Sequence, residues 1–412
     1  MIVQRTEQHV IDKQSKWYRM LESKCHVAKN IYNHGNYLVR QEFINNGKWL
    51  HYVDVEQQVK NDRDYPDYWE WNLANSGQQV LRQLEKNWKS FFKSIKDWKE
   101  NPSKYIGRPK LPKYLKKDGL CEFALTTQQV RLKDDNLIHF PKSMNGFTIQ
   151  PQFMYDERFV RFNQCRVVPK NDRIIVELIY EIDITDKPIE VGGISSIDLG
   201  IDNFVTFVDN LGNNPIIING KGLKSCNRYY NKLIARTKSQ LDANGNKGYS
   251  HLLYSITNKR NDKVKYFMNR ASRYIIENCL SAGITTIVVG KNGGWKQNSS
   301  LGKVSNQKFV QIPYNLFIQK LTYKAQEVGI QVILTEESYT SGTSFLDDEL
   351  PIKENYNRNR RIKRGLFQSN DGRLINADVN GAYQIMKKVF RDVNRPADIG
   401  LVLNPLRVNL NF

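Results

Sequence analysis

The chain has 412 residues, of which 40% are hydrophobic and 25% charged, so it can form two or three domains with buried cores. Its 62 lysines and arginines exceed its 42 aspartates and glutamates, and the resulting net charge of +20 favours a polyanionic partner such as nucleic acid. Because the chain lacks an apolar run of ~20 residues and a signal-peptide core near its start, we expect a cytoplasmic protein without a membrane partner.

The five cysteines and six histidines are scattered and do not form a recognisable metal motif. No two cysteines make a Cys-x-x-Cys pair, and no two histidines lie three to five residues apart. These spacings are typical of structural zinc sites, and an odd number of scattered cysteines argues against a disulfide framework. The sequence therefore predicts neither a Cys-rich zinc site nor a set of disulfides.

Residues 1–14 read as a short extended segment, and residues 15–118 as a basic helical region. Between Val80 and Trp98, apolar residues recur at steps of three and four, which predicts one helix with a single apolar face that ends before Pro102. An ordinary amphipathic helix explains this stripe, but it does not explain why the basic run continues through the loop to Lys117. We therefore expect five basic side chains here to contact nucleic acid: Lys89, Lys93, Arg108, Lys110 and Lys113.

Residues 119–190 contain short runs of strand formers separated by Asp-Asp-Asn, Asn-Gly and Lys-Asn-Asp-Arg turns, which predicts a small β-barrel. From about residue 191 strands alternate with long helical segments, which is typical of an α/β domain. The expected strands include Ile284–Val289 and Ile330–Leu334. The expected fold class is therefore α+β with several domains.

Two aspartates far apart in the sequence have unusual surroundings. Asp198 lies inside a run of strand formers, and Asp378 lies at the start of a late helical segment. A buried acid is unfavourable unless a cation compensates it, and phosphodiester cleavage by two metal ions needs several carboxylates at one point. The pair predicts a site for two Mg²⁺ ions, since Mg²⁺ prefers oxygen ligands.

Three segments resemble the RuvC-type nuclease motifs of the TnpB family, which are transposon-associated RNA-guided nucleases related to the type V CRISPR effectors. They are Ser-Ile-Asp-Leu-Gly-Ile-Asp-Asn-Phe at 196–204, Glu-Ser-Tyr-Thr-Ser at 337–341 and Asn-Ala-Asp-Val-Asn-Gly-Ala at 376–382. Upstream, residues 76–88 and Gly-Arg-Pro-Lys at 107–110 resemble the helical region of that family.

The resemblance implies a helical recognition lobe at 15–118 and a wedge β-barrel at 119–190 whose first strand is residues 1–14. It also implies an RNase H-like (RuvC) α/β nuclease domain at 191–412, with a target-nucleic-acid-binding lobe inserted at about 338–375. The implied partners are a guide RNA and double-stranded target DNA with a short adjacent motif, with base pairing reading the sequence and protein reading the motif.

The chain departs from the family at the third acid, because Gly290 follows the expected strand Ile284–Val289 where the family usually has a glutamate. The next expected strand is followed by Glu336 and Glu337, and in an RNase H-like sheet both strands end at the same edge. We expect Glu337 to complete the metal-binding and catalytic set with Asp198 and Asp378. Glu336 remains an alternative, although it would point to the opposite face if the strand continues.

A second departure is the lack of cysteines between residue 338 and the last aspartate, where the family usually binds zinc. We expect no zinc there, and metal-free packing around Phe345, Leu346 and Leu350 instead. The basic run that follows predicts nucleic-acid contacts near the site, since arginine suits phosphate recognition. The residues are Arg360, Arg361, Lys363 and Arg364, with Trp295 and Lys296 as a further aromatic and basic pair.

Two functions follow from this sequence. The first is an Mg²⁺-dependent RNA-guided DNA endonuclease in which the three acids hold the metals. The alternative is a nuclease-inactive RNA-guided DNA-binding protein, similar to a repressor, whose activity was lost with the glutamate at position 290. A transposase with a tyrosine nucleophile is disfavoured because the chain has no His-hydrophobe-His motif.

Overall fold

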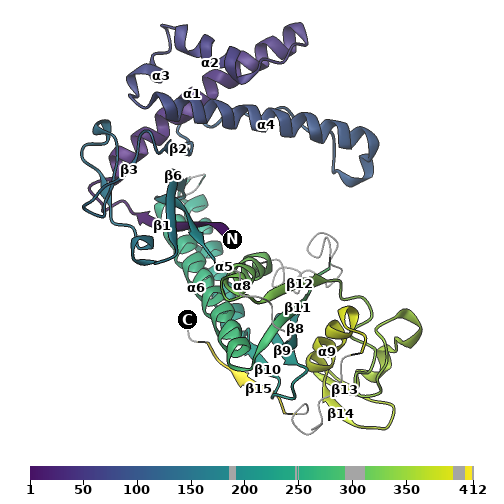
Figure 1. Cartoon of the computed structure of the whole chain (residues 1–412). Helices are drawn as coiled ribbons and strands as arrows, with labels where there is room; N and C mark the ends of the chain where they lie inside the picture. Colours follow the sequence, from purple (N-terminus) through teal and green to yellow (C-terminus); the bar gives the residue numbers. More distant parts are fainter. Residues whose placement is uncertain (185–191, 246–247, 249, 293–310, 393–403, 411–412) are drawn as a thin grey trace. The chain divides into compact units, whose positions relative to one another are not determined.

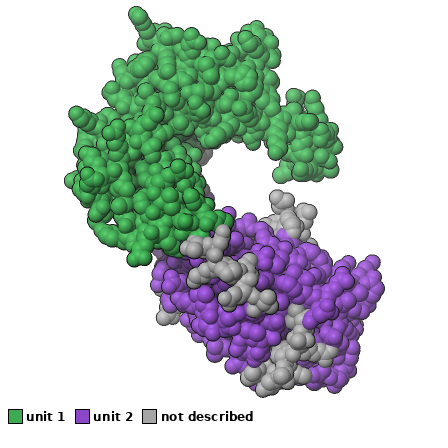
Figure 2. Space-filling view, viewed as in Figure 1, with its two compact units in different colours: residues 1–185 green, residues 186–412 purple. Residues whose placement is uncertain are grey.

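The structure is a computed structural model, and it describes residues 1–184, 192–245, 248, 250–292, 311–392 and 404–410. The chain divides into two compact units, Met1–Thr185 and Asp186–Phe412. Figure 1 traces both units and Figure 2 colours them separately. Among the described residues, no helix is both long and apolar enough to cross a membrane.

The first unit combines four α-helices with two antiparallel sheets. The helices are α1 (Tyr18–Asn46), α2 (Tyr52–Asn61), α3 (Asp67–Glu70) and α4 (Ala74–Glu100). Helix α1 ends where Gly47 adopts a left-handed φ of 66°, a conformation that glycine tolerates well. On α4 the predicted stripe is present, since Val80, Leu84 and Trp88 are buried and Pro102 opens a short 3₁₀ turn after the helix.

Seven strands make up the β part of this unit: β1 (Ile2–Ile11), β2 (Phe123–Thr126), β3 (Arg131–Leu132), β4 (Ile138–His139), β5 (Thr148–Ile149), β6 (Phe159–Lys170) and β7 (Arg173–Asp183). The four-stranded sheet has the order β1-β7-β6-β2, so the N-terminal strand does join the later strands. The three shortest strands form a separate sheet in the order β3-β4-β5.

The expected small β-barrel is not closed. In the sheet of the described residues, β1 and β2 lie at opposite edges and do not pair with each other. Strands β3, β4 and β5 have two residues each, which is too short to extend the larger sheet into a cylinder. The part predicted as a barrel is thus an open, mixed-length antiparallel arrangement that packs on the helices of the same unit.

The second unit is built on a six-stranded mixed sheet in the order β12-β11-β8-β9-β10-β15. The strands are β8 (Gly193–Leu199), β9 (Asn203–Asp209), β10 (Ile216–Asn219), β11 (Ile284–Gly290), β12 (Gln331–Thr335) and β15 (Leu406–Val408). Strands β8, β9 and β10 are antiparallel neighbours, whereas β11 is parallel to both β8 and β12. Strands β11 and β12, which are expected to end at the same edge of the sheet, are direct neighbours in it.

The helices of this unit are α5 (Lys221–Ala243), α6 (His251–Ser281), α8 (Tyr314–Glu327) and α9 (Ala377–Val389). Phe267 on α6 and Phe317 on α8 belong to one core with the sheet strands. Helix α9 belongs to a second core with the hairpin of β13 (Leu366–Gln368) and β14 (Leu374–Asn376). Strands β9 and β11 are buried along nearly their whole length, as expected for sheet strands that are covered by packed helices.

The lobe without cysteines is packed around aromatic and aliphatic side chains. Phe345 and Leu346 are buried, as predicted, while Leu350 is only partly buried. The Phe345 ring stacks on Tyr383 of α9, with ring centroids 4.1 Å apart and an interplanar angle of 7°. Asn380, also on α9, accepts a hydrogen bond from the Phe345 amide and donates to the Thr343 carbonyl, so the lobe is tied to the helix by polar contacts as well.

Candidate active site

Three predicted acids lie around the edge at which the parallel strands of the second unit end. Asp198 is the sixth residue of β8, Glu337 follows β12 by two residues, and Asp378 is the second residue of α9. In the parallel pairing of these two strands, Gly290, the last residue of β11, lies opposite Thr335, the last residue of β12. Since β8, β11 and β12 run in parallel, their carboxyl ends meet at one edge, which is where binding sites of such sheets form.

Asp198 lies in a protein-lined environment. The residue keeps some accessible surface, yet burial is the first cause that raises the pKa of its carboxyl well above the ordinary value, and repulsion from Asp378 and Glu337 adds to it. Helix α9 passes close by at Gly381, where an added Cβ would come within 3.2 Å of Asp198 Oδ2. The three acids are therefore close enough to interact, and α9 approaches Asp198 at a residue without a side chain.

Glu337 occupies the space that Gly290 leaves open. A Cβ on Gly290 would lie 2.6 Å from Glu337 Oε1 and 2.7 Å from Glu337 Cγ, so any side chain at 290 would collide with it. The Glu337 amide donates to Asn292 Oδ1 at 2.8 Å, which holds the backbone here. Its Oε1 is buried and has no hydrogen-bond partner among the described residues, and burial together with Glu336 raises the pKa of Glu337 to about 7.

Glu336 points away from this cluster. It is exposed, forms an ion pair with Lys388 and accepts a hydrogen bond of 2.8 Å from the Ser338 amide. The Lys388 ammonium is the main reason that the pKa of Glu336 falls to about 2. Of the two neighbouring glutamates, the structure brings only Glu337 to Asp198.

Asp378 is held by polar neighbours from other elements. Asn203 Nδ2, at the start of β9, donates to Asp378 Oδ2 at 2.6 Å, and the Arg361 guanidinium lies 3.5 Å from Oδ1. Asn376 caps α9 by accepting from the Asp378 and Val379 amides. Among the described residues, no group of three or more His, Cys, Asp or Glu side chains is arranged to hold a metal ion.

A cationic cavity of about 500 Å³ opens beside Asp378. Its lining combines Asp378 with basic side chains from three regions of the unit, namely Lys221, Arg361, Arg364 and Arg407. Arg364 forms an ion pair with Asp202 yet remains largely exposed. Such a cavity, basic and next to a carboxylate cluster, suits a phosphodiester backbone.

The other predicted nucleic-acid residues are distributed unevenly. Arg360 is mostly buried and is held by Glu349 at 2.5 Å and by Asn370 at 2.8 Å, so its guanidinium has a structural role here. Lys363 is exposed beside it in the chain. In the first unit, Lys93, Arg108, Lys110 and Lys113 are exposed, while Lys89 pairs with Glu85 on the same helix. Trp295 and Lys296 lie outside the described residues.

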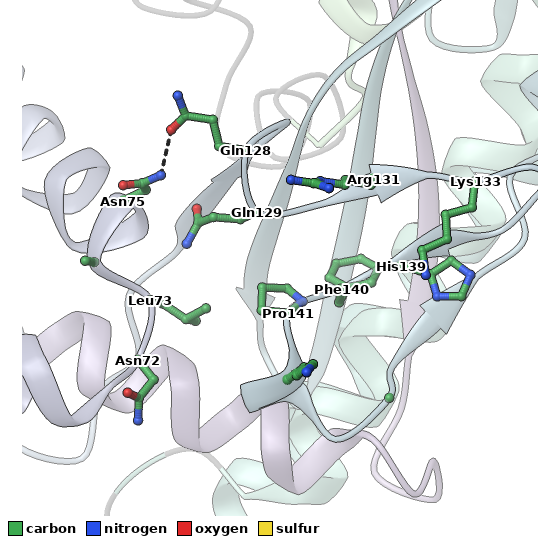
Figure 3. Close-up of a pocket in the computed structure, with 13 residues that line it drawn as sticks. Asn72, Leu73, Asn75, Gln128, Gln129, Arg131, Lys133, His139, Phe140 and Pro141 are labelled. Carbon is green, nitrogen blue, oxygen red and sulfur yellow. Dashed lines mark hydrogen bonds between the residues drawn. The ribbon is translucent and has the colours of Figure 1, made fainter.

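The first unit contains a polar cavity of about 810 Å³, shown in Figure 3. It lies between the segment that leads into α4 and the small sheet β3-β4-β5. Amide side chains line one part of it, and Asn75 donates to Gln128 across it at 2.8 Å. Basic groups line the other part: Arg131, Lys133, His139 and Lys142.

Several residues of these sites were missed by the sequence reasoning. Asn203 lies inside the quoted motif at 196–204, but nothing in its spacing showed that it would reach Asp378. Arg407 comes from β15, which pairs with β10 across 190 residues of sequence. Gln128 and Gln129 stand in an ordinary polar turn, and only the fold places them beside Asn75.

Comparison with known proteins finds two similar domains and one similar viral protein. Residues 177–296 match the family OrfB_IS605, described as a probable transposase, and residues 314–385 match the Cas12f1-like TNB domain. The TnpB-like protein ORF457 of Acidianus two-tailed virus is 24% identical over 96% of this chain and 86% of its own length.

Two solved structures were also found. One is the cryo-EM structure of the Cas12f1-sgRNA-target DNA complex, with 15% identity, coverage of 92% of this chain and 98% of that chain, and a TM-score of 0.35. The other is that of a CRISPR-Cas12f ternary complex, with 15% identity, coverage of 89% and 80%, and a TM-score of 0.37. Taken with the motifs at 196–204, 337–341 and 376–382, the two domain matches and the TnpB-like relative support the resemblance of this chain to the TnpB family, whose members are generally RNA-guided nucleases.

Proposed function

We propose that this protein is an RNA-guided DNA endonuclease that hydrolyses target DNA with two Mg²⁺ ions in a RuvC-like site. The observation that carries the proposal is the approach of Glu337 to Asp198 at the edge of the sheet, with a buried Glu337 oxygen that lacks a partner among the described residues. A protein gains nothing in stability from two neighbouring, partly buried carboxylates that repel each other. Such a pair is expected where a cation is to be bound.

The side chains fit a hard divalent cation. Asp198, Glu337 and Asp378 offer carboxylate oxygens only, which is the donor set that Mg²⁺ prefers, and the raised pKa values of the first two would fall once a cation is near. When bound, the ions would supply an activated water and stabilise the leaving oxygen. The strand order of the second unit, with antiparallel β8–β10 beside parallel β11 and β12, supports an RNase H-like assignment.

The residues around the acids would bind and orient the DNA. Arg364, Lys221 and Arg407 line the cavity beside Asp378 and would bind the phosphodiester backbone by charge. Asn203 would keep Asp378 oriented through its short hydrogen bond. Arg361 forms an ion pair with Asp378 in the present arrangement, and its guanidinium lies where it could instead bind a phosphate of the DNA.

The cavity in Figure 3 is our candidate for reading the short duplex motif beside the target. Amides of Asn and Gln pair with adenine edges in the major groove, and Arg or Lys pairs with guanine edges. Asn75, Gln128 and Gln129 offer the first kind of group, and Arg131 and Lys133 offer the second.

Plasmid cleavage tests the catalytic assignment. The protein would be purified with its RNA and incubated with Mg²⁺ and a plasmid that carries the guide-matched target. We expect Asp198→Asn and Glu337→Gln to abolish cleavage, while Glu336→Gln, the matched control one residue away, retains it. Cleavage that survives Glu337→Gln would remove Glu337 from the site.

A nuclease-inactive RNA-guided DNA-binding protein is the second candidate. It is favoured by the Arg361–Asp378 ion pair, which takes up one of the three acids, and by the glycine at 290. This candidate predicts guided binding by the wild type that neither Mg²⁺ nor Asp198→Asn changes. Target binding without any cleavage at millimolar Mg²⁺ would favour it over the endonuclease.

A further inference from the structure

A second cavity of the first unit, of about 530 Å³, has an apolar floor and a cationic rim. The floor consists of Phe43 from α1 with Phe91, Phe92 and Ile95 from α4, all of which keep part of their surface exposed. The rim carries four basic side chains: Arg40, Arg108, Lys110 and Lys113. This cavity lies apart from the polar cavity of Figure 3, with which it shares no lining residue.

The aromatic rings of the floor are held in place by their neighbours. The centroid of the Phe92 ring lies 5.6 Å from that of Phe43 and 5.3 Å from that of Phe91, and Phe91 lies 5.9 Å from the fully buried Trp88. Edge and tilted contacts of this kind fix ring orientation without covering every ring face. The floor is therefore a rigid aromatic surface rather than a collapsed core.

The segment at 105–117 forms the opposite wall and is anchored at both ends. Near its start, Asp97 of α4 accepts hydrogen bonds from Lys104 at 2.8 Å and from the Tyr105 hydroxyl at 2.5 Å. Its middle is bound to α1, since Arg40 donates to the Pro112 carbonyl at 2.9 Å, and its far end is bound there by Lys29, which donates to the Lys117 carbonyl. We call residues 105–117 the basic strap.

Further contacts along α1 extend this anchoring. Asn33 both donates to the Leu115 carbonyl at 2.9 Å and accepts from its amide at 2.8 Å, as a neighbouring strand would. Lys29 donates to the Lys117 carbonyl at 2.8 Å. The basic strap is thus fixed although it is neither helix nor strand, and its side chains are presented at defined positions around the cavity.

The charges on the rim are not neutralised within the unit. Arg108, Lys110 and Lys113 are exposed, and none of them forms an ion pair with a residue that the structure describes. Pro109 and Leu111, which alternate with them, line the cavity with apolar surface. The occupant that complements this arrangement has a flat apolar body and an anionic edge.

We propose that this cavity binds an unpaired nucleotide of a single-stranded nucleic acid, with the base against Phe91 and Phe92 and the flanking phosphates on the basic strap. Stacking on aromatic rings combined with a cationic groove is how proteins hold single strands, and it tolerates any base. An apolar peptide would leave the three cations uncompensated. The inference rests on the proposed nucleic-acid function, to which it adds a place for one extruded base.

The test uses the full chain stripped of nucleic acid at high salt, in EDTA so that cleavage plays no part. The probe is a twelve-nucleotide oligouridine with one central 2-aminopurine, whose fluorescence falls on stacking, and a matched deoxyuridine oligonucleotide is the second arm. Anisotropy gives Kd, and 2-aminopurine intensity reports the stacked base. The Asp198→Asn protein serves as a parallel sample, since loss of endonuclease function leaves this readout unchanged.

We expect Phe91→Leu and Phe92→Leu each to weaken binding about fivefold and to abolish the quenching of 2-aminopurine. Lys110→Ala should reduce the salt dependence of log Kd by about one while quenching persists, because it removes one phosphate contact. Tyr37→Leu, which removes an exposed aromatic ring of α1 outside the cavity, is the control and should match the wild type. Ile95→Glu places an anion on the floor without removing a ring and should weaken binding more than tenfold.

Quenching in the ribonucleotide arm assigns the cavity to RNA, and stronger quenching in the deoxyribonucleotide arm assigns it to a DNA strand. Both results support the inference. Equal Kd and equal quenching in the wild type, both Phe→Leu variants and Ile95→Glu would overturn it. Binding of an acidic apolar peptide, but of neither oligonucleotide, would overturn it as well.

Discussion

Replacing Glu337 by glutamine is expected to stabilise the metal-free protein at neutral and alkaline pH. Burial raises the pKa of Glu337 to about 7, against 4.5 for an ordinary glutamate. Because the folded state holds the proton more tightly than the unfolded state, the wild type loses stability as pH rises from 4.5 to 7. At about 1.4 kcal/mol for each unit of pH, the full cost above pH 7 is about 3 kcal/mol. Glutamine does not ionise and avoids this cost.

The assay is urea unfolding of both proteins in EDTA, followed by circular dichroism between pH 4 and pH 8.5. The variant should equal the wild type below pH 4.5 and exceed it by about 3 kcal/mol at pH 8. Millimolar Mg²⁺ should reduce this difference in the free energy of unfolding by stabilising the wild type alone, since a bound cation offsets the buried charge. A difference that stays constant across this pH range would refute the reasoning.

Glu336 offers a matched control of opposite sign. Lys388 lowers the pKa of Glu336 to about 2, so its contribution is present above pH 4.5 and disappears as pH falls toward 2. Glu336→Gln should therefore lower stability slightly at pH 8, by an amount that salt reduces because the pair is exposed. Two adjacent glutamates thus give opposite pH profiles.

Three further predictions concern other parts of the molecule. Gly290→Ala should reduce cleavage more than tenfold, because its Cβ would displace the Glu337 carboxylate, and cleavage at the wild-type rate would contradict the geometry. Phe345→Leu should lower the free energy of unfolding by about 1 kcal/mol, because it removes the stacking on Tyr383. Calorimetry should show a lower Tm, and an unchanged Tm would contradict this. Gln128→Ala should make the protein less selective for the motif beside the target, as measured with a plasmid library in which that motif is randomised. The loss of discrimination at the affected base pair should be about 1–3 kcal/mol. An unchanged motif preference would exclude Gln128 from reading the motif.

Much of the secondary structure followed from local pattern. The apolar stripe from Val80 to Trp98 predicted the course of α4, and the strand formers predicted β11 and β12 within one or two residues. Helical periodicity is a property of neighbouring residues, so a single sequence carries it. The small barrel predicted for residues 119–190 is not closed, because closure depends on which edge strands pair, and runs of strand formers and turns do not specify that pairing.

The candidate site was only partly predictable. The surroundings of Asp198 in a strand and of Asp378 at a helix start indicated these two acids, and the expected alternation of side chains along the strand favoured Glu337. Only the structure shows that Glu337 fills the space beside Gly290 at the end of β11. Arg360 shows the opposite case, since its place in a basic run predicted a nucleic-acid contact while Glu349, eleven residues away, binds it within the lobe. Contacts between residues distant in the sequence leave no local signal.

Because the Glu337 side chain occupies the space beside Gly290, the residue at one position limits which residue the other can hold during evolution. A Cβ at 290 would lie 2.6 Å from both Glu337 Oε1 and Ile385 Cδ1, so an acid on β11 could not coexist with Glu337 in its present position. A chain with an acid at both positions would have to move the Glu337 side chain, whereas a chain that first loses the acid at 290 passes through a form with two acids. Returning the acid to position 290 would therefore require the Glu337 side chain to move or to be made smaller, as in Gly290→Glu combined with Glu337→Gly.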